Sequence, residues 1–125
     1  MHYLTIEHIL QLHALVLLRD GGADGVRDVG RLEAAVATQY QTVFDEELYV
    51  GPYAKTAAMI RGITGDHAFY DGNKRTSMLV GLTFLEVNGC VFCAEVGEIE
   101  DFAVEIAVKN HDIATIAEWL EKHCK

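Results

Sequence analysis

Residues 67–76 read His67-Ala68-Phe69-Tyr70-Asp71-Gly72-Asn73-Lys74-Arg75-Thr76. These ten residues combine an imidazole, a carboxylate, a glycine, an amide and two cations, and few structural roles require that mixture. Segments with helical spacing of apolar residues lie on both sides. The pattern therefore predicts a functional loop that ends where a helix begins.

A helix that begins near Gly72 or Asn73 leaves its first backbone N–H groups without partners. Together with the positive end of the helix dipole, these groups attract anions, and phosphate is the usual ligand. Lys74 and Arg75 lie in the first turn, where a positive charge costs about 0.3–1 kcal/mol. Because a bound phosphate would reverse that cost, we expect an anion here.

Two side chains precede the expected helix. Asp71 could hold Mg²⁺, which binds one or two carboxylates together with phosphate oxygens and water. His67 could accept a proton from a hydroxyl. A purely structural interpretation is also open at this point: Asp71 or Asn73 would only cap the helix, Lys74 and Arg75 would be solvated, and His67 would be a packed loop histidine.

Apolar periodicity predicts that most of the remaining chain is helical. The expected helices cover about 6–20, 29–40, 52–61, 73–88, 97–109 and 113–123. Thr5, Asp28 and Asp112 are suitable N-caps, and Gly89 suits a left-handed C-terminal cap. The periodicity of the third helix stops at the glycines of residues 62–65.

Residues 42–51 fit a small hairpin as well as a loop, with apolar residues around an acidic tip at 45–47. We name residues 42–50 the flap. A short extended piece is expected at 91–94. We therefore expect an all-α single domain over residues 1–125, a helical bundle with a small β-hairpin flap.

Composition excludes several classes of protein. Of the 125 residues, 50% are hydrophobic, 23% are charged and one is proline, which excludes disordered and collagen-like chains. Ten Lys and Arg against 19 Asp and Glu give a net charge of −9, so nucleic acid is a poor partner. No apolar run reaches the roughly 20 residues of a membrane span, and we expect a soluble cytoplasmic protein.

The sequence has three cysteines, Cys90, Cys93 and Cys124, which are too few for a secreted scaffold cross-linked by disulfides. We expect free thiols in a reducing compartment. Cys90 and Cys93 have Cys-x-x-Cys spacing, but no second pair of ligands follows, as a zinc site would need. We therefore expect these two cysteines to be buried as small side chains.

The 67–76 stretch resembles the signature of Fic-domain proteins, His-x-Phe-x-Asp/Glu-Gly-Asn-x-Arg. The matching residues are His67, Phe69, Asp71, Gly72, Asn73 and Arg75. Similarity to the short death-on-curing (Doc) toxins of this family extends to Tyr3-Leu4-Thr5, to residues 30–35, to the flap and to Asn88-Gly89. The resemblance implies the helical Fic/Doc fold, in which the flap docks a target peptide as an added strand.

At two positions the sequence differs from the wider Fic family and resembles the death-on-curing branch. Adenylylating Fic enzymes have glycine in place of Lys74 and a second arginine in place of Met78. In the death-on-curing branch the lysine occupies part of the α-phosphate pocket, and ATP is held with its γ-phosphate toward the target hydroxyl. The implied reaction is phosphorylation of a protein Thr or Ser with Mg²⁺ and ATP.

The resemblance assigns a role to each polar residue of the stretch. His67 would be the base and Asp71 the Mg²⁺ ligand. Gly72, Asn73, Lys74 and Arg75 would bind the cofactor phosphates, and Lys74 and Arg75 would also act in catalysis. Phe69 has no polar role, and we expect it to plug the loop into the core.

The resemblance further implies the toxin of a toxin–antitoxin pair, with a threonine of translation elongation factor Tu as target and a Phd-like antitoxin as partner. Self-inhibited relatives carry a Ser/Thr-x-x-x-Glu-Gly/Asn helix, which residues 42–47 fail to match at the final position. Two alternatives remain at this stage: a Fic-type adenylyltransferase that transfers AMP, and a non-catalytic module that binds a nucleotide or a partner.

Overall fold

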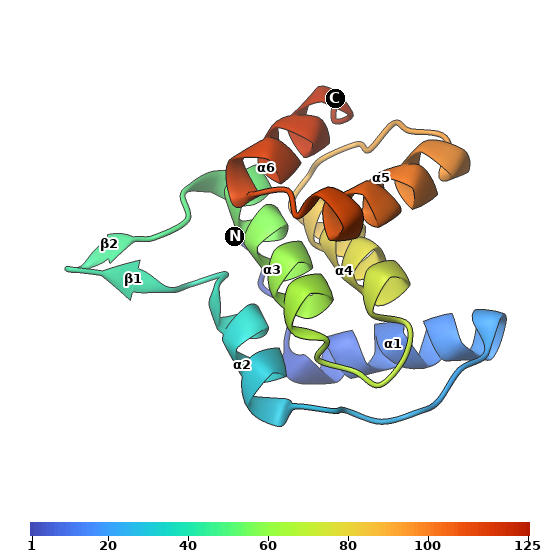
Figure 1. Cartoon of the computed structure of the whole chain (residues 1–125). Coiled ribbons are helices and arrows are strands. Elements are labelled where there is room, and N and C mark those ends of the chain that lie inside the picture. The colour runs from blue at the N-terminus through green and yellow to red at the C-terminus, as the bar shows by residue number, and fades with distance from the viewer.

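The computed structural model describes residues 1–125 as six helices and one two-stranded sheet. The elements are α1 (Ile6–Asp20), α2 (Val29–Ala37), β1 (Thr42–Val43), β2 (Glu46–Glu47), α3 (Gly51–Asp66), α4 (Asn73–Val87), α5 (Val96–Lys109) and α6 (Ile113–Lys122). Helices α3 and α4 lie side by side at the centre, with α1 and α2 packed on one side of the pair and α5 and α6 on the other (Figure 1). The expected all-α fold with a small hairpin is confirmed.

The predicted helix ends are largely confirmed. Thr5 forms a capping box with His8 at the start of α1. The side chains of Asp28 and Asp112 accept hydrogen bonds from backbone N–H groups in the first turns of α2 and α6. Gly89 follows α4 with φ +91°, the left-handed conformation that glycine favours.

The end of α3 differs from the prediction, because the helix continues through Gly62 and Gly65 to Asp66. A Cβ atom on Gly62 would lie 3.0 Å from the Cβ of Ala35, so this glycine lets α2 pack closely on α3. Gly81 of α4 faces Ile60 in the same way. Gly62 and Gly81 mark close packing and do not end their helices, whereas a Cβ atom on Gly65 would meet nothing within 4 Å, and this residue is also helical.

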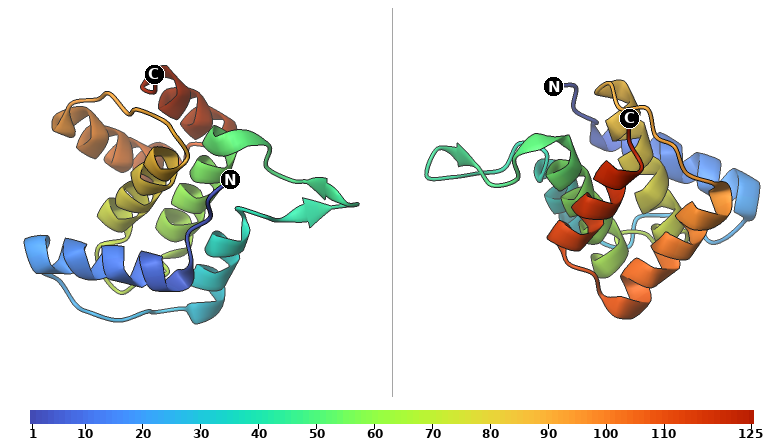
Figure 2. Two further views of the ribbon diagram at one scale, coloured as in Figure 1. Left: turned by 180° about the vertical axis from the view of Figure 1, so that it is seen from behind. Right: turned by 90° about the horizontal axis from the view of Figure 1, so that it is seen from above.

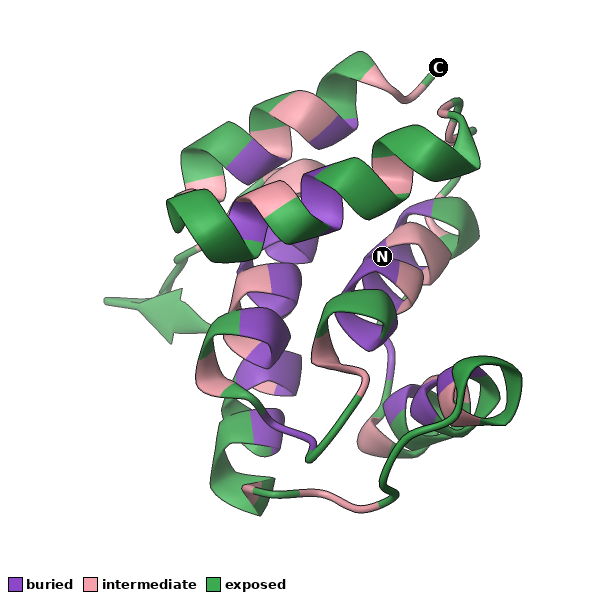
Figure 3. Cartoon of the chain, turned by 45° about the vertical axis from the view of Figure 1, so that its right-hand side comes forward, coloured by how far each residue is buried: buried purple, intermediate pink, exposed green.

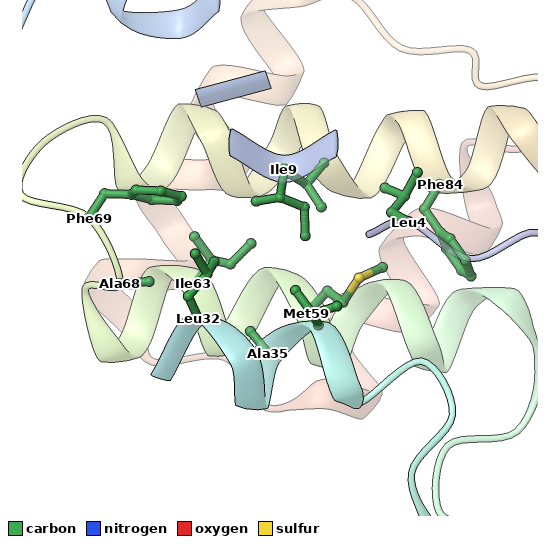
Figure 4. Packing of buried hydrophobic residues seen from close by; sticks show 11 residues of the cluster. Leu4, Ile9, Leu32, Ala35, Met59, Ile63, Ala68, Phe69 and Phe84 are labelled. Atoms are coloured by element: carbon green, nitrogen blue, oxygen red, sulfur yellow. The ribbon is translucent and has the colours of Figure 1, made fainter. Parts of the chain in front are cut away.

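The core lies on both sides of the α3–α4 pair, which carries half of the buried positions (Figure 3). One cluster joins α1 and α2 to the central pair and includes Ile9, Leu32 and Met59 (Figure 4). The other joins α5 and α6 to the pair and includes Phe102 and Leu120. This arrangement fixes α3 and α4 relative to each other, and with them the loop that connects their ends.

The flap is a hairpin that projects from the helical body (Figure 2). Thr42 pairs with Glu47 and Val43 with Glu46, so the two glutamates lie in a strand and not at the tip as expected. Phe44 and Asp45 form the tip with φ +51° and +64°, as a two-residue hairpin turn requires. The side chain of Phe44 is 96% exposed.

A buried lysine anchors the flap to the helical body. Lys55 of α3 is only 1% exposed. Its Nζ donates hydrogen bonds to the main-chain oxygen of Gln39 at 2.7 Å and to Oε1 of Glu47 at 3.2 Å. The base of the flap is therefore attached to the N-terminal half of α3.

The expectation of three free thiols is wrong. Cys90, after α4, and Cys124, after α6, form a disulfide, and Cys93 is free and exposed. An antiparallel bridge between Phe92 and Cys124 brings the two segments together. Spacing along the chain could not show this proximity, which results from the packing of α6 on α3.

None of the six helices combines the length and the hydropathy that crossing a bilayer requires.

Candidate active site

All six predicted site residues line one cavity of about 690 Å³ between the end of α3 and the start of α4. These residues are His67, Asp71, Gly72, Asn73, Lys74 and Arg75. Two left-handed residues shape the connecting loop, since His67 ends α3 with φ +46° and Gly72 precedes α4 with φ +78°. A cavity of this size lies within the range typical of small-molecule sites.

The start of α4 opens toward this cavity. No side chain caps the helix, and the backbone N–H groups of Asn73, Lys74 and Arg75 find no backbone acceptor in the chain. Free N–H groups and the positive end of the helix dipole make this terminus suitable for an anion. The Lys74 side chain is exposed at the same end of the helix.

Arg75 is held by an acidic residue at the end of α1. Its NH1 atom lies 2.6 Å from Oδ1 of Asp20. The hydrogen bond and the charge of Asp20 raise the pKa of the Arg75 guanidinium above its ordinary value. Arg75 lines both this cavity and a neighbouring groove between α1, α4 and α5. Its charge therefore lies at the boundary between the two.

Asn73 uses its side chain to shape the loop. Its Oδ1 accepts a hydrogen bond from the backbone N–H of Phe69 at 2.9 Å, and its Nδ2 donates to the Phe69 carbonyl at 2.8 Å. Both ends of the amide are engaged in this way. The group that Asn73 leaves unpaired at the cavity is therefore its backbone N–H.

Phe69 plugs the loop into the core, as expected (Figure 4). Its ring is fully buried and stacks on His13 of α1, with 3.8 Å between the ring centroids. His13 is itself buried, and its Nε2 donates a hydrogen bond to the Asp71 main-chain oxygen at 2.9 Å. One histidine of α1 thus contacts the loop at two points.

Asp71 is the one carboxylate among the residues that line the cavity. Its Oδ2 accepts a hydrogen bond from the backbone N–H of Ala23 at 2.7 Å, which fixes the carboxylate and leaves Oδ1 free to bind a ligand. A single carboxylate beside a phosphate site matches the preference of Mg²⁺ for few protein ligands, with phosphate and water completing the shell. The residues present therefore fit this metal.

The connection between α1 and α2 supports the loop, and sequence reasoning missed it. The backbone N–H groups of Arg27 and Asp28 donate to the Ala68 carbonyl, and Gly25 accepts from the Tyr70 N–H. A Cβ on Gly22 would lie 3.1 Å from the Cβ of Asp71, so glycine is needed for this approach. The glycine cluster in residues 21–25 was the available signal.

Comparisons with known proteins agree with this geometry. The profile of the Fic/DOC family matches residues 3–85. The protein named Toxin Doc from Mycolicibacterium smegmatis is 37% identical over 117 residues, which cover 92% of this chain and 88% of that protein. The protein named Protein kinase doc from Escherichia phage P1 is 30% identical over 122 residues, with 98% of this chain and 95% of that protein covered. The chain belongs to the Fic/DOC family.

Proposed function

We propose that this chain is a toxin that phosphorylates a Thr or Ser hydroxyl of a protein target in the cytoplasm, using ATP and Mg²⁺. The observation that carries the proposal is the convergence of an imidazole, a carboxylate, three cations (Arg27, Lys74 and Arg75) and an uncapped helix N-terminus on one cavity. Relatives named as a toxin and as a protein kinase support it. Phosphoryl transfer needs such charge neutralisation and alignment more than it needs covalent help from the protein.

His67 is the base in this proposal. Its ring is exposed at the cavity, where it accepts the proton of the target hydroxyl while that oxygen bonds to the γ-phosphorus and the bond to the ADP oxygen breaks. The proton then passes from His67 to solvent. General-base help of this kind contributes roughly 10²–10⁴-fold to rate.

The remaining residues hold the phosphates. The free N–H groups of residues 73–75 and the side chains of Lys74 and Arg75 neutralise the negative charge of the phosphate oxygens. Asp71 would hold Mg²⁺, which would supply positive charge against the phosphate oxygens when bound. Gly72 supplies the left-handed turn that points the first N–H groups of α4 at the cavity.

Lys74 supports phosphate transfer over AMP transfer. Adenylylating Fic enzymes have glycine at this position, and the longer, charged side chain of Lys74 occupies space beside the first turn of α4. Met78, which replaces a second arginine, is buried and provides no charge for an alternative phosphate position. Both residues favour the orientation in which the γ-phosphate meets the target.

The flap offers the docking edge for the target, for which we propose elongation factor Tu. Its strands are only two residues long and both are exposed. The base of the flap is attached to the start of α3 and His67 lies at the end, a separation of about 24 Å for a 16-residue helix. A protein segment can span that distance, whereas a small hydroxyl compound cannot.

Intact-mass analysis tests this proposal. Purified elongation factor Tu is incubated with the chain, Mg²⁺ and ATP. A mass increase of one phosphate on the target is the expected result. A mass increase of one AMP would instead support adenylylation, and an unchanged mass with no consumption of ATP for any target would support a binding module.

We also propose that a Phd-like antitoxin inhibits the chain by covering an apolar groove of about 340 Å³ between α1, α4 and α5. Eight of its twelve lining residues are hydrophobic, and it ends at Arg75 beside the cavity. A disordered tail that folds as a helix places apolar anchors at the spacing such a groove accepts.

The structure of the flap fits inhibition by a separate protein. Residues 42–47, which partly resemble the inhibitory helix of self-inhibited relatives, form the hairpin and no helix. Co-expression with the upstream open reading frame should give a stable complex and restore growth. A toxin that is silent when expressed alone would contradict this part of the proposal.

A further inference from the structure

We propose that Arg27 is a positioning residue for His67: it fixes the backbone that carries the base, and it acts without touching the reacting atoms. This inference rests on the proposed function of His67. Arg27 lies outside the 67–76 stretch, in the connection between α1 and α2, and the two residues are 40 positions apart.

Arg27 donates hydrogen bonds to three consecutive carbonyl oxygens, those of residues 66–68, where α3 ends. The Nε of Arg27 donates to the His67 carbonyl at 2.8 Å, and its NH2 donates to the Asp66 carbonyl at 2.8 Å. The backbone N–H of Arg27 donates to the next carbonyl, that of Ala68, also at 2.8 Å. Side chain and main chain together fix the path of the loop on both sides of the base.

The residue type suits this position for two reasons. The last carbonyls of a helix lack N–H partners and carry its negative dipole, which favours a cation. The planar guanidinium also offers two donors in a fixed fork, whereas the ammonium of lysine is a single flexible point charge. Arg27 therefore defines the orientation of two peptide groups at once.

The conformation of His67 explains why such support is needed. His67 has φ +46°, a strained conformation for a non-glycine residue, and such a conformation persists only where the surrounding structure holds it. With the Arg27 contacts removed, the peptide groups on both sides of His67 can relax toward ordinary conformations. The imidazole then leaves its place beside the hydroxyl, even though every residue of the 67–76 stretch is still present.

Arg27→Ala and Arg27→Lys test this inference, because the side chain is exposed and its loss leaves no hole in the core. The matched control is Arg61→Ala. Arg61 donates to the His111 carbonyl and to Oδ1 of Asn110, which ends α5 with φ +51°, so it also supports a left-handed helix end, but it does not line the cavity.

We expect Arg27→Ala to lower kcat of phosphoryl transfer by about 10²-fold, the loss typical of a small misplacement of a reacting group. The KM for ATP should change by less than roughly threefold, because the groups of residues 73–75 still bind the phosphates. Arg27→Lys should give a smaller loss, and added ethylguanidinium should restore part of the activity of Arg27→Ala. Arg61→Ala should keep the wild-type kcat.

A second readout does not depend on activity. Hydrogen exchange followed by NMR should show faster exchange of the Ala68 and Phe69 amides in Arg27→Ala and an unchanged rate in Arg61→Ala. Unchanged kcat and exchange in Arg27→Ala would overturn the inference, as would equal losses of kcat in both alanine variants. If the wild-type protein transferred no phosphate at all, the proposed function would fail, while amide exchange would still decide whether Arg27 holds the loop.

Discussion

The loop at residues 67–72 and the flap at residues 42–50 are held in opposite ways. Both connect helices, and both contain non-glycine residues with positive φ. The loop receives hydrogen bonds from His13, Ala23, Arg27 and Asn73, and it buries Phe69 completely. The flap has one strand pair with two residue pairs, together with the contact of its base with Lys55, and its tip is exposed.

The difference matches two different tasks. A reacting group must lie close to its productive position before the substrate arrives, because misplacement costs rate directly. A docking strand must instead keep its edge accessible so that a second chain can pair with it. Changes in the loop should therefore affect turnover, and changes in the flap should affect recognition of the target.

The largest effect is expected for His67→Ala. The exposed ring contributes little to the core, so the fold should persist while transfer falls by roughly 10²–10⁴-fold and growth recovers on expression of the variant. His2→Ala, which changes another exposed histidine, is the control and should be as toxic as the wild type. Full toxicity of His67→Ala would remove this residue from the mechanism.

Lys74→Gly should lower phosphoryl transfer by roughly 10²–10³-fold, the loss typical of one preorganised donor to a developing charge. It also restores the small residue that adenylylating relatives carry, so a product with one added AMP becomes possible. Mass analysis separates the two products, and Lys125→Gly serves as a control at an exposed lysine. An unchanged rate of phosphorylation would mean that Lys74 does not contact the nucleotide.

Cys124→Ser changes overall stability at a site outside both the loop and the flap. Closing the 34-residue separation between Cys90 and Cys124 should stabilise the fold by roughly 3–4 kcal/mol in the chain-entropy description. Denaturant unfolding should show that loss in the variant and in reduced wild type, while the exposed Cys93→Ser should show none. Equal stability of all three proteins would contradict the disulfide.

The smallest effect is expected at the base of the flap. Lys55→Met leaves the buried Gln39 carbonyl without this donor, which should cost about 1–3 kcal/mol, and frees the flap from α3. The KM for the protein target should rise while the KM for ATP stays unchanged. The control Lys109→Met removes an exposed pair with Glu105, which solvent screens, and should change stability little. A change in ATP binding alone would contradict the division between loop and flap.

Sequence alone could predict the parts of the site that are contiguous in the chain. The six predicted site residues between positions 67 and 75 line one cavity, because a single turn and the start of a helix bring them together. The caps at Thr5, Asp28 and Asp112 are equally local, since each side chain contacts the first turn of its own helix.

The remaining features depend on contacts between distant parts of the chain. The hydrogen bonds of Arg27 to the end of α3 and the pairing of Cys90 with Cys124 join residues 34 to 40 positions apart. Gly62 shows the same limit, since a glycine that permits the approach of Ala35 has the same local pattern as one that ends a helix. Tertiary packing decides such cases.

Isotope transfer from labelled ATP tests the central claim most directly. Elongation factor Tu is incubated with the wild-type chain, Mg²⁺ and ATP labelled either at the γ-phosphate or at the α-phosphate, with His67→Ala as the control. The wild-type chain should transfer the γ-label to the target and leave the α-label in solution. His67→Ala should transfer no label. Transfer of the α-label to the target would contradict phosphorylation, and equal γ-label with His67→Ala would contradict the role of the loop.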